Sequence, residues 1–461
     1  MSTPSRAAGA TFLGHPIGLA YLSFAEAWER FSYYGMQTLL VLYMTKQLLL
    51  APHVDRILGF GPFRAFLESA GPMTPVALAS AIFGLYAACV YLTPILGGLL
   101  ADRVLGRTRT VTLGALLMAT GHFLMAFDVS FLIALTCLLL GVGCFKGNIA
   151  TQVGELYAPD DLRRANAFQL YMFGIQIAVI ISPLVCGTLG QKVGWHWGFG
   201  AAGVGMLIGL AIYLWGGKYL APDVLAQRTA AQAAAPAKTQ SKEPLTKEEW
   251  LRVGAICVAC FIVGAFWAVY EQQGNTMQTW ADKNTIWPTI AGFQIPTAWF
   301  QSFNPFMIMV LTPAVNGLWT YQQKRGKEPS TVSKMAIGSL ILGLSFVVMA
   351  VGVRVIGENG KGSLFWPFFA TLVITVGELY LSPIGLSLVT KASPKRLVSL
   401  MMGVWFVSSF LGGFASGVLG VFYKDGHHER FFWIMVAIGV NTALAMWAFN
   451  KPLRKILGTN A

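Results

Sequence analysis

Residues 17–44 read IGLAYLSFAEAWERFSYYGMQTLLVLYM, an apolar stretch that carries three charged residues, Glu26, Glu29 and Arg30. A helix needs about 20 mostly apolar residues to cross the hydrocarbon core of a bilayer, and this stretch is long enough. A charge inside such a span costs at least ~2.5–3.5 kcal/mol on insertion scales, so it needs a partner or a wet cavity. The stretch therefore predicts a membrane-spanning helix that contains a polar site.

Similar apolar stretches recur along the whole chain. We predict twelve membrane-spanning helices, at residues 17–44, 75–100, 108–128, 130–154, 166–190, 196–217, 250–273, 297–322, 332–355, 364–390, 399–422 and 430–450. The composition agrees, because 55% of the 461 residues are hydrophobic and 11% are charged, whereas soluble chains carry roughly 25% charged residues. We therefore predict an all-α multi-pass membrane protein and exclude a soluble enzyme, a disordered protein and a secreted disulfide scaffold.

The distribution of Lys and Arg predicts the orientation of these helices. One side of the predicted spans collects 22 of the 33 Lys and Arg, and the other side collects 9. Cytoplasmic loops carry the excess of positive charge in membrane proteins. Both termini are therefore predicted to be cytoplasmic. The same rule accounts for the net charge of +13 without a nucleic-acid partner.

A polar segment at residues 218–249 divides the chain into two halves. It is rich in Ala, Gln, Lys and Pro, which predicts a flexible cytoplasmic linker. The predicted parts are a cytoplasmic N-terminus (1–16), a six-helix bundle (17–217), the linker, a second six-helix bundle (250–450) and a cytoplasmic C-terminus (451–461). Short basic loops follow both the second and the eighth span, a weak internal repeat. Two six-helix bundles related by an axis along the membrane normal are typical of the major facilitator architecture, with the substrate site between the halves.

Six ionisable residues lie inside the predicted spans: Glu26, Glu29, Arg30, Lys146, Glu271 and Glu378. Residues three and four apart share a helix face, so Glu26, Glu29 and Arg30 lie together, and Tyr33 and Tyr34 follow one turn later. Four carboxylates against two cations leave an excess of negative charge. A protonated carboxylate in some states, as a proton-coupled cycle requires, is one reading, and a static set of ion pairs is the other.

These charges also predict the kind of substrate. The guanidinium of Arg30 matches the geometry of a carboxylate, and Lys146 adds a second positive charge. Glu271 and Glu378, from the other half of the chain, suit a cationic group. We therefore expect a substrate that carries both charges.

Five motifs resemble those of the proton-dependent oligopeptide transporter family, in chain order over nearly all predicted spans. Residues 26–35 match the signature E-x-x-E-R-F-x-Y-Y-G. The other four lie at residues 141–148, 266–276, 301–305 and 377–387. The resemblance implies proton-driven import of di- and tripeptides by alternating access, with the proton as the coupling ion and no cofactor. We expect a bacterial inner-membrane protein, because no large insertion separates spans 9 and 10, and we also expect a monomer.

The resemblance also implies roles for individual residues. Arg30 and Lys146 would hold the peptide carboxylate, and Glu378 with Asn304 would hold the amino terminus. Proton coupling would involve Glu26, Glu29, Arg30, Lys146 and Glu271. The remaining residues of the substrate pocket would be Tyr33, Tyr34, Tyr91, Gln176, Trp267, Ser382 and Trp405. Such a lining holds the two termini and leaves the peptide side chains to an aromatic, wet surface.

The chain departs from the family pattern at three positions. Gln176 stands where members often carry Asn, which moves the amide by one methylene. Gln37 stands where many relatives carry an Arg able to pair with the glutamate that matches Glu271. Gly84 stands where animal relatives carry a His. A different histidine, His122, lies outside the motifs, and we predict that it packs between helices.

Two other functions compete with peptide transport. One is a carrier of the same fold for another small anion such as nitrate. Such relatives tend to lose the E-x-x-E-R motif, which is intact here, and a mononegative ion would leave Glu378 without a role. The other is a membrane-embedded enzyme. The six histidines are scattered and the chain contains neither H-E-x-x-H nor G-x-S-x-G, so we predict no enzyme and no metal site.

Overall fold

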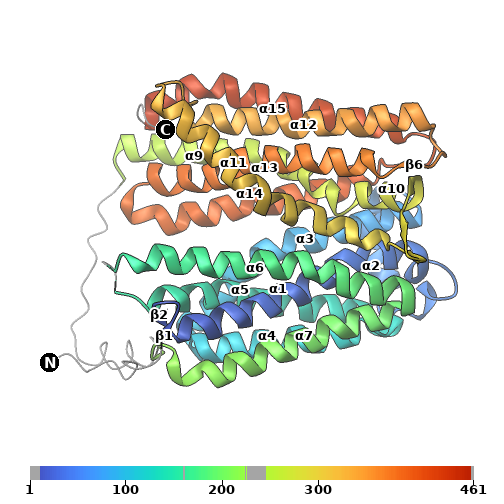
Figure 1. The fold of residues 1–461 in the computed structure, drawn as a ribbon, viewed down its shortest axis with the longest axis horizontal. Helices are drawn as coiled ribbons and strands as arrows, with labels where there is room; N and C mark the ends of the chain where they lie inside the picture. The colour runs from blue at the N-terminus through green and yellow to red at the C-terminus, as the bar shows by residue number, and fades with distance from the viewer. Residues whose placement is uncertain (1–10, 159–160, 224, 226–244, 458–461) are drawn as a thin grey trace. The chain divides into compact units, whose positions relative to one another are not determined.

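The computed structural model describes residues 11–158, 161–223, 225 and 245–457. Each of the twelve predicted ranges coincides with one long helix of this part of the chain (Figure 1). The twelve helices are α1 (Gly18–Tyr43), α3 (Pro75–Leu100), α4 (Arg107–Leu124), α5 (Phe131–Glu155), α6 (Arg163–Thr188), α7 (Trp195–Gly216), α9 (Lys247–Tyr270), α11 (Phe303–Lys324), α12 (Thr331–Ile356), α13 (Phe365–Ala392), α14 (Val398–Gly420) and α15 (His428–Leu457).

Short elements connect the long helices. Two more α-helices are α2 (Phe60–Leu67) and α10 (Thr276–Asn284), and single turns of 3₁₀- or π-helix include η1 (Met44–Leu48), η4 (Ala101–Leu105), η6 (Leu189–Val193), η8 (Glu271–Gln273) and η9 (Thr297–Ser302). Strands of two residues form three pairs: β1 (Thr11–Phe12) with β2 (His15–Pro16), β3 (Thr285–Ile286) with β6 (Gly362–Ser363), and β4 (Thr289–Ile290) with β5 (Phe293–Gln294).

Nine of the helical segments in the described part of the chain are long and apolar enough to cross a membrane. The helices α1, α4 and α11 are not among them; in α1 the apolar run is interrupted by Glu26, Glu29 and Arg30. The structure thus supports a multi-pass helical membrane protein. The count of twelve spans and the cytoplasmic position of both termini stay predictions.

Internal contacts divide the chain into two compact units. The first contains Met1–Leu39, Pro52–Phe60 and Leu92–Ser241, and the second contains Leu40–Ala51, Gly61–Tyr91 and Lys242–Ala461. The division therefore runs through α1 and α3. Most of the predicted linker at residues 218–249 lies outside the described residues.

Several helix ends differ from the predicted boundaries, and α11 begins six residues late because residues 297–302 form the 3₁₀-helix η9. Helix α9 begins at Lys247, three residues before the predicted span, because a capping box precedes it. The side chain of Thr246 accepts a hydrogen bond from the backbone N–H of Glu249, and the Glu249 carboxylate accepts one from the backbone N–H of Thr246. Helix α15 continues to Leu457, beyond the predicted end at residue 450, where basic residues suit the negative end of the helix dipole.

A small hairpin, β1–β2, ends the predicted N-terminal segment and contacts the loop between α5 and α6. His15 Nδ1 lies 2.9 Å from the Tyr157 hydroxyl, and Arg163 donates a hydrogen bond of 3.2 Å to the carbonyl of Gly14. Arg163 also hydrogen-bonds the carboxylate of Asp161, which lowers the pKa of Asp161 below its ordinary value. Burial raises the pKa of Tyr157 to about 12, so its phenol stays neutral. These contacts hold the start of α1 against the first unit.

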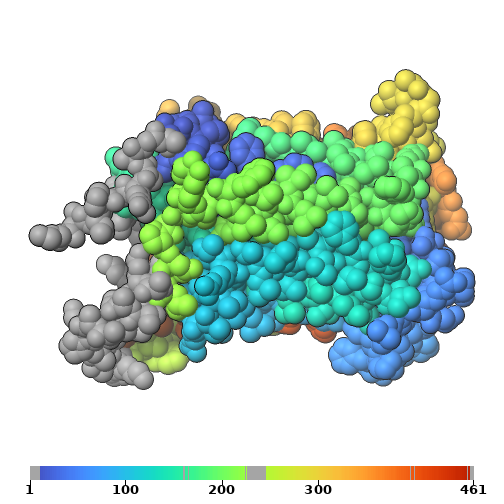
Figure 2. Space-filling view, turned by 90° about the horizontal axis from the view of Figure 1, so that it is seen from below, coloured from blue at the N-terminus to red at the C-terminus, as the bar shows by residue number. Residues whose placement is uncertain are grey.

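In the first unit, α4 packs against α5 and α7. These helices also present a broad face of the unit, coloured cyan to green in Figure 2. Large apolar side chains of these three helices are exposed, among them Leu116, Leu140, Val204, Leu214 and Trp215. Exposed apolar surface of this extent suits contact with lipid.

The second unit is built around α12, which packs against α13 and α15, while α9 packs against α14. Its core buries aromatic side chains of several helices, including Phe266, Trp280, Phe346 and Phe432. Within this unit α3 and α14 approach each other closely at Gly84 and Gly417. A Cβ on Gly84 would lie 2.3 Å from the Cα of Gly417, so this crossing has no room for a side chain.

Candidate functional site

The first group of candidate residues lies on α1. Arg30 Nη2 lies 2.7 Å from Glu26 Oε1, and its Nε lies 3.1 Å from Glu29 Oε2. All three residues are buried: Glu26 is 2% exposed, Glu29 0% and Arg30 6%. The spacing of three and four residues brings them onto one face, as predicted, and one guanidinium serves both carboxylates. Glu26 Oε2 and both oxygens of Glu29 accept no hydrogen bond from the described residues.

Lys146 from another helix of the first unit, and Tyr34 from α1 itself, complete this acid–base cluster. Lys146 on α5 lies within electrostatic range of Glu29, and Tyr34 on α1 within range of Arg30. The ring of Tyr34 also packs edge-on against Tyr33, with ring centroids 5.2 Å apart. The cluster thus contains two carboxylates, Glu26 and Glu29, and two cations, Arg30 and Lys146. Its net charge is zero when all four groups are ionised.

The second group lies in the other unit, around Glu378 on α13. Asn304 on α11 donates a hydrogen bond of 2.9 Å to Glu378 Oε2 and lies 3.1 Å from the hydroxyl of Thr375. Tyr270 on α9 also hydrogen-bonds Glu378. Among the described residues, no Lys, Arg or His forms an ion pair with this carboxylate. Neutral donors orient it and leave its charge uncompensated, which suits a cationic ligand.

Aromatic side chains adjoin the second group. Trp267 lies one helical turn before Tyr270, and their rings meet edge to face with centroids 5.3 Å apart. Trp405 on α14 packs over Gly385, where a Cβ would lie 2.2 Å from the indole ring. Gly385, the second glycine of the motif at 377–387, therefore leaves room for the Trp405 ring.

The other predicted site residues are half-buried and are placed on their expected elements. Tyr91 lies on α3, Gln176 on α6 and Ser382 on α13, one turn after Glu378. Glu271 begins η8, directly after α9. The structure thus brings together the predicted set on α1 and α5, and separately Asn304 with Glu378.

Three residues around these groups were not predicted from the sequence. Tyr171 on α6 is 2% exposed and lies within electrostatic range of Glu26, Glu29 and Arg30. Thr375 and Tyr270 adjoin the Asn304–Glu378 pair. Thr375 stands three residues before Glu378 and therefore on the same helix face, a signal that could have found it. Tyr270, next to Glu271, and Tyr171 carried no spacing signal toward their partners.

Two positions that stood out in the sequence, Gly84 and His122, have physical explanations in the structure. Gly84 lies at the close crossing of α3 and α14, so any side chain there meets the backbone of Gly417. His122 on α4 is fully buried, and its Nε2 lies 2.9 Å from the hydroxyl of Ser32 on α1. This contact agrees with the predicted packing role of His122.

The chain is similar in sequence to known transporters. Residues 108–222 and 218–434 match the sequence profile of the POT family. The chain is 32% identical to the "Peptide transporter YePEPT" of Yersinia enterocolitica subsp. palearctica, over 89% of each chain. It is 31% identical to the "Di-/tripeptide transporter" of Lactococcus lactis subsp. cremoris, over 97% of this chain and 98% of the relative.

Solved structures show the same fold. A crystal structure of a peptide transporter POT in complex with sulfate superposes with a TM-score of 0.82, at 30% identity and 97% coverage of both chains. A mutant of a peptide transporter POT in complex with alafosfalin superposes with a TM-score of 0.81 at 31% identity, again with 97% coverage of both chains. The chain is therefore a member of the POT family, a multi-pass membrane transporter and not an enzyme.

Proposed function

We propose that this protein imports di- and tripeptides together with protons by alternating access. The relatives named above are peptide and di-/tripeptide transporters. The observation that carries the proposal is the contrast between two groups: a cluster of two acids and two bases around Arg30, and a half-buried carboxylate, Glu378, that has only neutral donors among the described residues. A substrate with a carboxylate at one end and an ammonium at the other satisfies both.

The roles of the residues follow from these charges. Arg30 and Lys146 hold the peptide carboxylate, since the guanidinium offers a fork of donors that matches it. Glu378 holds the amino terminus, and Asn304 orients Glu378. Tyr33, Tyr34, Tyr91, Gln176, Trp267, Ser382 and Trp405 line the pocket and accept side chains of different sizes.

Charge balance explains why a proton accompanies the peptide. The cluster of Glu26, Glu29, Arg30 and Lys146 is neutral when ionised. A peptide carboxylate that takes over Arg30 adds one negative charge in a buried setting, where an uncompensated charge is costly. Protonation of Glu26 or Glu29 removes that charge and releases Arg30 for the substrate. Glu271 serves the proton or gating network of the second half.

The remaining parts of the proposal concern the setting. Twelve spans form two six-helix bundles of the major facilitator fold, with both termini in the cytoplasm. The protein acts as a monomer in a bacterial inner membrane, and the proton is its coupling ion. The similarity in fold to POT structures supports this arrangement.

Uptake of labelled dialanine into proteoliposomes tests the proposal. We expect an inward proton gradient to drive uptake, a protonophore to abolish it, and Glu26→Gln to reduce gradient-driven uptake at least about tenfold because the proton site is lost. Glu68→Gln, the same change at a half-buried glutamate that pairs with Arg64 outside the long helices, serves as the control and should leave uptake unchanged. If folded protein transports no di- or tripeptide, the peptide assignment is wrong and an anion such as nitrate becomes the substrate to test.

A second prediction separates the two ends of the peptide. Glu378→Gln should weaken competition by dialanine at least about tenfold, because truncating one partner of a buried, hydrogen-bonded charge pair costs about 2–5 kcal/mol or more. Competition by N-acetyl-dialanine, which has no ammonium, should be the same in the variant and the wild type. Thr375→Val is the matched control, since it removes a contact of Asn304 without removing the charge. Equal losses for both ligands would contradict the assignment of Glu378 to the amino terminus.

A further inference from the structure

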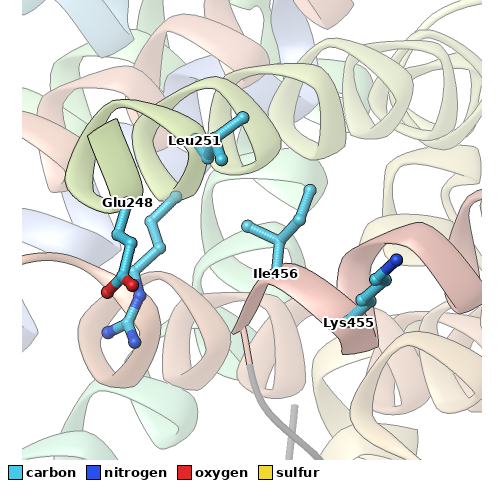
Figure 3. Close-up of a pocket in the computed structure, with 5 residues that line it drawn as sticks. Glu248, Leu251, Lys455 and Ile456 are labelled. Carbon is cyan, nitrogen blue, oxygen red and sulfur yellow. The ribbon is translucent and has the colours of Figure 1, made fainter.

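A pocket of about 560 Å³ lies between the first turns of α9 and the last turn of α15, within the second unit. Glu248, Leu251, Arg252, Lys455 and Ile456 line it. In Figure 3, Glu248 and Leu251 extend from α9, Ile456 extends toward α9 from α15, and Lys455 extends from α15 on the side away from Glu248. The helices α9 and α15 pack directly against each other, so the pocket is a feature of one unit.

Three charged side chains line this pocket, two of them basic and one acidic. Within the described residues, Glu248, Arg252 and Lys455 form no ion pair, although the neighbouring Glu249 binds Arg396. Two cations against one carboxylate give the pocket a net positive charge. Leu251 and Ile456 add an aliphatic wall beside the charges.

The position along the two helices places this pocket at the edge of the bilayer. The apolar segments of these helices are Lys247–Asn284 and His428–Leu453, so Lys455 and Ile456 lie just past the end of one, and Glu248 lies at the start of the other. Trp250 and Trp447, near the same ends, are 61% and 69% exposed. Exposed Trp is typical of the membrane–water interface.

We infer that this pocket binds the headgroup of an anionic phospholipid with a single negative charge, such as phosphatidylglycerol. Arg252 holds the phosphate, and Lys455 reaches it with its flexible side chain. Leu251 and Ile456 contact the first methylenes of the acyl chains. Basic pockets beside membrane helices bind acidic headgroups in this way. The aliphatic wall and the position at the bilayer edge favour a lipid over a free phosphate.

Native mass spectrometry of the delipidated full-length protein tests this inference, with dioleoyl phosphatidylglycerol and phosphatidylcholine as the added lipids. The wild-type protein should bind at least one molecule of phosphatidylglycerol, with a higher affinity than it has for phosphatidylcholine. Arg252→Ala combined with Lys455→Ala should lower that affinity at least about fivefold, whereas Glu248→Gln should raise it, because it removes the one negative charge.

The control replaces Lys324 and Lys327 by Ala. Both are exposed at the end of α11, so the variant loses the same net charge elsewhere in the same unit. It should bind phosphatidylglycerol like wild type. Equal losses in both double variants, or no preference over phosphatidylcholine, would overturn the site. Displacement by soluble glycerol 3-phosphate at the concentration of the lipid would overturn it too, since the pocket would then be a phosphate site. If the double variant fails to fold, Glu248→Gln alone decides, and an unchanged affinity overturns the inference.

Discussion

Replacing Arg30 by Met should destabilise the protein by about 3–5 kcal/mol, the usual cost of removing one partner of a buried ion pair. The guanidinium lies 2.7 Å from Glu26 Oε1 and 3.1 Å from Glu29 Oε2, and both carboxylates are at most 2% exposed. Without Arg30 they stand three residues apart on one helix face, where like charges repel. Lys146 would then be the one cation of the cluster.

A compensated variant distinguishes this electrostatic cause from a loss of packing. Arg30→Met combined with Glu26→Gln and Glu29→Gln removes the stranded carboxylates and should recover most of the lost stability. Arg30→Lys keeps the charge without the fork and should fall in between. Thermal unfolding in detergent measures these stabilities. Dialanine uptake should be lost in both Met variants, since the anchor of the peptide carboxylate is gone. Equal stability of the single and triple variants would show that the cost is steric.

Replacing Gly84 by Val should cost about 3 kcal/mol, at the upper end of what overpacking a core costs. The first carbon of any side chain there would lie 2.3 Å from the Cα of Gly417, 2.4 Å from its backbone N and 2.8 Å from the carbonyl oxygen of Gly413. These are backbone atoms, so no change of rotamer relieves the clash. The helices α3 and α14 have to separate, and even Gly84→Ala should lower the melting temperature.

Gly98→Val is the matched control, because Gly98 lies on the same helix and a Cβ there meets nothing within 4 Å. Both variants carry the same cost of a β-branched residue in a helix. Their difference in melting temperature therefore reports the crossing of α3 with α14. If Gly84→Val and Gly98→Val have the same melting temperature, α3 and α14 do not approach each other as closely as in this structure.

Much of the local structure could be predicted from the sequence. A helix satisfies its own backbone hydrogen bonds, so a long apolar run in a bilayer becomes a helix whatever its neighbours are. The range 17–44 therefore coincides with α1, and the spacing of Glu26, Glu29 and Arg30 sufficed to predict their contact. The family motifs selected Asn304 and Glu378 although 74 residues separate them, and the structure joins them by a hydrogen bond.

Contacts between helices were decided by the tertiary structure alone. No spacing rule connects the partners in three pairs: Tyr171 with Glu26, Tyr270 with Glu378, and Gly84 with Gly417. Each pair forms because two helices pack with particular sides together. The pocket of Arg252 and Lys455 likewise arises where the start of α9 meets the end of α15. The sequence by itself determined which segments are helical, which charges share a face and which family the motifs resemble. The tertiary structure decided the partners, since packing across helices sets distances that the order of residues along the chain does not contain.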